Sequence, residues 1–117
     1  MKLFKVNKLK SLLKNISSND ANIMNCVNVL ESDAAKNYQV GGEVPIREVI
    51  DIYKRRYELN DNKNIKGFPE LMKALYAEND KSVIIHSFCY GDETYLIFTN
   101  SKISELIGIL KIPGHST

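Results

Sequence analysis

The chain has 117 residues, of which 44% are hydrophobic and 26% are charged. This length allows a core of real size but leaves little room for a second domain, and the composition is that of an ordinary globular protein. The net charge is only +2, but residues 1–19 hold five lysines and no acidic residue, which leaves the remainder at −3. This asymmetry is compatible with a polyanion-binding arm, although lysines on a solvated helix face are the commoner explanation.

The two cysteines, Cys26 and Cys89, are too few for a disulfide framework and lie in no cluster of the kind that binds zinc. We therefore expect reduced thiols, no metal and no cofactor. The N-terminal segment is not typical of a signal peptide, because lysines interrupt its apolar residues at every turn. No apolar run is long enough to cross a bilayer, so we expect no membrane span.

Apolar residues at helical spacing predict two helices in the first part of the chain. The first covers residues 5–15, with its lysines opposite the leucines. The second follows a polar, Asn-rich loop, runs from about Cys26 to Tyr38, and ends at Gly41-Gly42.

Two further helices are each opened by a proline at the first position, where the missing N–H costs nothing. Pro45 opens the third helix and Pro69 opens the fourth, which ends near Asn79-Asp80. The stripes that we expect to be buried are Ile46, Val49, Ile50, Tyr53 and Tyr57 on the third helix, and Phe68, Leu71, Met72, Leu75 and Tyr76 on the fourth.

The period then changes from helical to extended. Two β-rich runs, Ser82–Tyr90 and Thr94–Thr99, are separated by Gly91-Asp92-Glu93, which predicts a tight hairpin. The tail could form a helix capped by Ser101, or a third strand at Ile109–Ile112. Helices followed by a small antiparallel sheet make an α+β fold.

A cysteine at the start of the second helix would lie beside unpaired backbone N–H groups and the positive end of the helix dipole. Both favour the thiolate, which is the nucleophilic form, so Cys26 is a candidate catalytic nucleophile. The alternative is a buried cysteine that acts as a small hydrophobic residue.

His86 interrupts a strongly apolar strand, whereas the other histidine, His115, lies close to the C-terminus. A half-buried imidazole needs specific hydrogen-bond partners. With a three-residue turn, Asn100 shares one face of the sheet with His86 and could orient its ring, and Cys89 lies on the opposite face. A two-residue turn would shift the register and make Thr99 the orienting residue instead.

A cysteine that opens a helix, then a histidine in one strand and Asn or Asp after the next, is the papain-like chain order. More narrowly, Asn25-Cys26-Val27-Asn28, Asp33-Ala34-Ala35, Gly41-Gly42 and Val44-Pro45 resemble the papain-fold toxin domains of bacterial polymorphic and contact-dependent growth inhibition systems. The resemblance covers residues 16–101 of a single domain, 1–117, and leaves the lysine-rich helix 1–15 and the tail 102–117 outside it.

The resemblance implies a small papain-like fold and a Cys26–His86–Asn100 triad. The expected reaction is acyl transfer on a protein amide, by a glutamine deamidase or a narrow-specificity cysteine peptidase. The Cys26 N–H and a side chain of Asn22 or Asn25 are candidates for the oxyanion hole.

The chain also departs from the family at two places. Val29 stands where members often carry a second cysteine, and Thr99-Asn100-Ser101 replaces an Asp-x-Gln element. Such domains end large secreted proteins, so the resemblance implies delivery within a larger effector, action in the target-cell cytoplasm, and a cognate immunity protein as partner. Two alternatives stay open: an RNA-cleaving toxin domain that uses His86, and a non-catalytic immunity or interaction protein.

Overall fold

The structure is a computed structural model that describes residues 2–16, 21–32, 37–59 and 65–113. Within these residues, four helices and five strands follow one another. They are α1 (Lys2–Asn15), α2 (Ala21–Leu30), β1 (Gln39–Val40), β2 (Val44–Pro45), α3 (Ile46–Leu59), α4 (Phe68–Ala77), β3 (Ser82–Tyr90), β4 (Glu93–Asn100) and β5 (Leu106–Pro113). The predicted α+β class is therefore confirmed.

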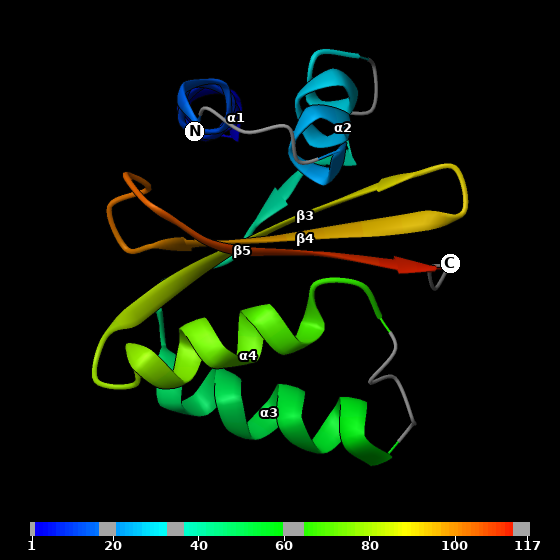
Figure 1. Ribbon diagram of the computed structural model, residues 1–117. Helices are drawn as coiled ribbons and strands as arrows, with labels where there is room; N and C mark the ends of the chain where they lie inside the picture. The colour runs from blue at the N-terminus through cyan, green and yellow to red at the C-terminus, as the bar shows by residue number, and fades with distance from the viewer. Residues whose placement is uncertain (1, 17–20, 33–36, 60–64, 114–117) are drawn as a thin grey trace.

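The strands form one antiparallel sheet in the order β1-β3-β4-β5, and β2 also pairs with β3. Helices α1 and α2 cover one face of this sheet, and α3 and α4 cover the other (Figure 1). Because both faces are covered, side chains that alternate along β3 and β4 enter two separate cores. His86 and Phe88 point toward α1 and α2, whereas Val83 and Ile85 point toward α3 and α4.

The position of the second helix differs from the prediction. Helix α2 begins at Ala21 and ends at Leu30, so the predicted helix from Cys26 to Tyr38 is wrong. The physical reason is that the end of the Asn-rich segment, expected as a loop, forms the first turn of α2. This turn is amphipathic and buries Ile23. Gly41-Gly42 does not end a helix, but lies in the connection between β1 and β2.

The register of the β3–β4 hairpin also differs. Tyr90 pairs with Glu93, so the turn consists of Gly91 and Asp92 and not of three residues. Gly91 has a φ of 61°, which a two-residue hairpin turn needs and glycine adopts easily. The shift of one residue places Ile97 opposite His86, and it moves Thr99 onto the face of the sheet that His86 occupies.

Helices α3 and α4 and both long strands lie close to where the sequence predicts them. Tyr76 is an exception, because its side chain is 47% exposed, and the side chain of Tyr57 lies outside the described residues. The tail forms the strand β5 and not a helix, and this strand is longer than the one expected at Ile109–Ile112. None of the helices in the described part of the chain is long and apolar enough to cross a membrane.

The turn before α4 lies against the last strand of the sheet. Gly67 has a φ of 89°, and a Cβ atom at this position would lie 2.8 Å from the carbonyl oxygen of Ile109. Only a residue without a side chain fits both the backbone conformation and this close approach. Gly67 therefore fixes how α4 packs beside β5.

Candidate functional site

Cys26 lies in the second half of α2, and its side chain is 0% exposed. Its backbone N–H falls within the helical hydrogen-bond pattern, which begins at Ala21, so it is not one of the unpaired N–H groups of the helix start. Cys26 therefore does not lie at the positive end of the helix dipole, and the prediction that this position favours a thiolate is wrong. Cys26 packs in the core cluster that also contains Tyr38 and Tyr95.

His86 is also 0% exposed, and both of its ring nitrogens have hydrogen-bond partners. The hydroxyl of Tyr38, directly before β1, bonds Nδ1, and the two rings stack with centroids 5.7 Å apart. On the other side, Nε2 lies 3.1 Å from Oγ1 of Thr99 on β4. The residue before β1 and the strands β3 and β4 are thus joined by polar side chains inside the core.

We assign the proton positions in this chain of contacts from its last member. The Thr99 hydroxyl donates to the carbonyl oxygen of Ile84 at 3.5 Å, so its oxygen accepts the proton of Nε2. Nδ1 is then the acceptor of the Tyr38 hydroxyl proton. This arrangement is complete with a neutral imidazole, and no buried side-chain N or O atom in the described residues lacks a partner.

Burial and charge both disfavour protonation of this ring. Desolvation lowers the pKa of His86 from 6.5 to about 4, and the ammonium group of Lys5 on α1 acts in the same direction. Desolvation likewise raises the pKa of Tyr38, which keeps its hydroxyl protonated. The pair is therefore neutral at physiological pH.

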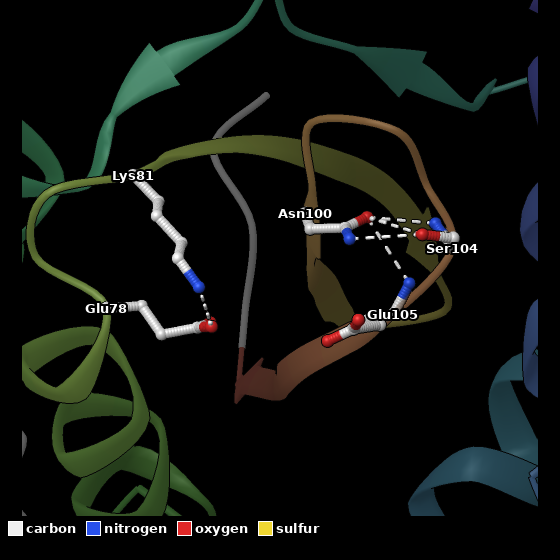
Figure 2. Close-up of polar contacts among 5 residues, drawn as sticks. All are labelled: Glu78, Lys81, Asn100, Ser104 and Glu105. Atoms are coloured by element: carbon white, nitrogen blue, oxygen red, sulfur yellow. Dashed lines mark hydrogen bonds and ion pairs between the residues drawn. The ribbon is translucent and has the colours of Figure 1, made fainter.

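Asn100 does not take part in this site. It pairs with Val83, which places its side chain on the opposite face from His86. Its Oδ1 accepts the backbone N–H groups of Ser104 at 2.9 Å and Glu105 at 3.3 Å, as Figure 2 shows. The predicted role of Asn100 as the orienting residue is wrong, because the two-residue turn makes Thr99 the neighbour of the ring.

Instead, Asn100 organises the turn between β4 and β5. Its Nδ2 donates to Oγ of Ser104 at 3.1 Å, so both ends of the amide bond the same turn (Figure 2). The turn contains Ile103, which has a φ of 54°, a conformation that is strained for a β-branched residue. Asn100 holds this turn closed while the Ile103 side chain is buried.

The two side-chain candidates for the oxyanion hole both lie on α2 but differ in exposure. Asn22 precedes Cys26 by one turn and lines a cavity of about 370 Å³ between α2, the start of α4 and β5. Asn25 is exposed. The Cys26 N–H, the expected first donor, is inside the helix, so the predicted hole does not form around it.

Sequence reasoning missed Tyr38 and held Thr99 only as an alternative. Tyr38 was assigned to the end of a helix, but the run Tyr38-Gln39-Val40 before two glycines is also typical of a short extended segment. His115 lies outside the described residues, and so does the Asp33-Ala34-Ala35 segment.

The polar chain from Tyr38 through His86 to Thr99 ties strands together and is fully satisfied without a ligand. A buried ring with both nitrogens bonded has no free nitrogen to take a proton from a thiol. The thiol of Cys26 has no exposed surface through which a substrate could reach it. Comparison of the chain with protein families, with curated proteins and with solved structures gives no match.

Proposed function

We propose that this chain is a non-catalytic binding domain, of the immunity or interaction type. The observation that carries the proposal is the state of His86, whose two nitrogens are bonded by Tyr38 and Thr99 inside a core that excludes solvent. A catalytic imidazole must keep one nitrogen available for the proton that it transfers. Here the ring supports the sheet instead.

The environment of Cys26 supports the same proposal. A reactive cysteine is partly exposed and lies in an electropositive setting such as a helix start, whereas a structural cysteine is buried and inert. Cys26 is fully buried in the second half of α2 and packs among apolar and aromatic side chains. This is the setting of a small core residue.

A cysteine hydrolase of the papain-fold toxin type is the second candidate. It is favoured by the placement of Cys26, His86 and Thr99, which all face the layer between the sheet and helices α1 and α2. For acyl transfer, the Tyr38 hydroxyl would have to leave Nδ1, and α2 would have to move so that the sulfur becomes accessible. The conformation described above would then be an inactive resting state of the enzyme.

Alkylation of the folded protein with iodoacetamide at neutral pH separates the two candidates. A binding domain predicts that Cys26 reacts more slowly than Cys89, because Cys26 is buried and Cys89 is only half-buried. Mass spectrometry of the peptides at successive times gives both rates, and unfolding in urea should make them equal. A Cys26 that reacts faster than Cys89 in the folded protein would favour the hydrolase and overturn our proposal.

A further inference from the structure

Helix α1 presents a polar and basic face to solvent. Its apolar residues Val6, Leu9 and Leu13 are buried in the core below it, which fixes the orientation of the helix. The residues that consequently point outward are Asn7, Lys8, Ser11, Lys14 and Asn15. We call this set the α1 face.

The charge at the N-terminal end of α1 opposes the helix dipole, whereas Lys14 in the last turn is favourably placed. The first turn contains Lys2 and Lys5 and no acidic residue, although the N-terminal end of a helix favours negative charge. Glu31, directly after α2, pairs with Lys14 and also lies near Lys10, so the positive charge at the C-terminal end of α1 is partly neutralised. The excess positive charge is therefore concentrated toward Lys5 and Lys8, and nothing in the fold of the described residues requires it there.

We infer that the α1 face is the docking surface for an acidic protein partner. This inference rests on the proposed binding function and names the surface that serves it. An acidic surface would complement the lysines of α1 and would also offset the unfavourable charge at the start of the helix. The exposed Asn7, Ser11 and Asn15 provide donors and acceptors, which suit the mixed polar groups of a protein surface.

Three features favour a protein over a nucleic acid as this partner. Residues 2–30 contain no arginine, the residue that binds phosphate groups with two hydrogen bonds. The α1 face contains no aromatic residue on which a base could stack. Residues 20–117 have a net charge of −3, which would repel a long polyanion but does not oppose a compact acidic patch docked on α1.

The test is the binding of a short fluorescein-labelled oligoglutamate peptide, which stands in for a compact acidic patch, followed by anisotropy at low ionic strength. The variant Lys8→Glu/Ser11→Glu reverses one charge and adds a second negative charge at two exposed positions of the α1 face. Its control, Lys73→Glu/Ala77→Glu, makes the same charge change at exposed positions of α4, on the other side of the sheet. We expect the α1 variant to bind about tenfold more weakly, and the control to stay within about threefold of the parent.

Circular dichroism of both variants checks that each is folded. The inference is overturned if the control loses as much affinity as the α1 variant, or if an RNA with the same number of charges binds more tightly than the peptide. Neither result bears on the cysteine, so failure here is distinct from failure of the proposed function, which the alkylation rates report.

Discussion

Thr99 Oγ1 lies 3.1 Å from Nε2 of His86, so the ring is linked to β4 as well as to Tyr38. The threonine hydroxyl donates a hydrogen bond to the carbonyl oxygen of Ile84. It therefore fixes the imidazole as a neutral donor toward β4 and an acceptor toward Tyr38. The histidine acts as a polar link within the sheet.

The first prediction concerns pH. The pKa of His86 is about 4 in the folded chain and 6.5 when it is unperturbed, so the unfolded chain binds a proton first as the pH falls. The contribution of the neutral His86 ring to the free energy of unfolding is then fully present above pH 6.5 and is lost as the pH falls toward 4. Between pH 7 and pH 5 the free energy of unfolding should drop by about 2 kcal/mol.

Urea unfolding at closely spaced pH values measures this slope. The variant His86→Gln has no titrating ring at this position and should show a much flatter dependence over the same range. An equal slope in parent and variant would mean that His86 is not the group responsible.

The second prediction concerns the Tyr38 hydroxyl. Tyr38→Phe keeps the ring but leaves Nδ1 of His86 buried without its donor, which should cost about 1–3 kcal/mol of unfolding free energy. Tyr76→Phe removes the same group from a ring that is 47% exposed and should change stability by less than about 0.5 kcal/mol. Urea unfolding of both variants gives the comparison. Similar losses of unfolding free energy in the two variants would mean that the Tyr38–His86 hydrogen bond does not stabilise the fold.

The third prediction separates Thr99 from Asn100. Thr99→Val removes the acceptor of the Nε2 proton and should shift the NMR signals of the His86 ring. Asn100→Ala should leave those signals in place and cost about 1–2 kcal/mol, because the strained turn around Ile103 loses its support. A large shift of the His86 ring signals in Asn100→Ala would mean that Asn100 contacts the ring after all.

The fourth prediction concerns growth. If the chain acts by binding, Cys26→Ala should have the same effect as the parent on bacteria that produce it, apart from a stability loss of about 1 kcal/mol for the smaller side chain. Cys89→Ala is the matched control. If the parent stops growth and folded Cys26→Ala does not, the hydrolase candidate is correct.

Local sequence signals predicted much of the fold. The β-branched run of β3 and the apolar stripes of α3 and α4 are strong and regular, and the structure follows them. The segments β1 and β2 have two residues each, too few for a periodic signal, and they form because β3 offers its edge.

The candidate site was harder to predict, because it depends on the exact register of the hairpin and on the exact start of a helix. One residue in the hairpin turn decides whether Thr99 or Asn100 faces His86. The start of α2 decides whether Cys26 is at a helix end or inside it. Tyr38 is 48 residues away from His86 along the chain, so only the folded sheet brings the two together.

The contact of Gly67 with the Ile109 carbonyl has a consequence for self-association. β5 is the last strand in the sheet order, and such an edge can template the addition of strands from other molecules. The turn at Gly67 occupies the space beside that carbonyl, so an incoming strand cannot pair there. A larger residue at this position would have to push the turn away from this carbonyl and would remove that local protection of the edge.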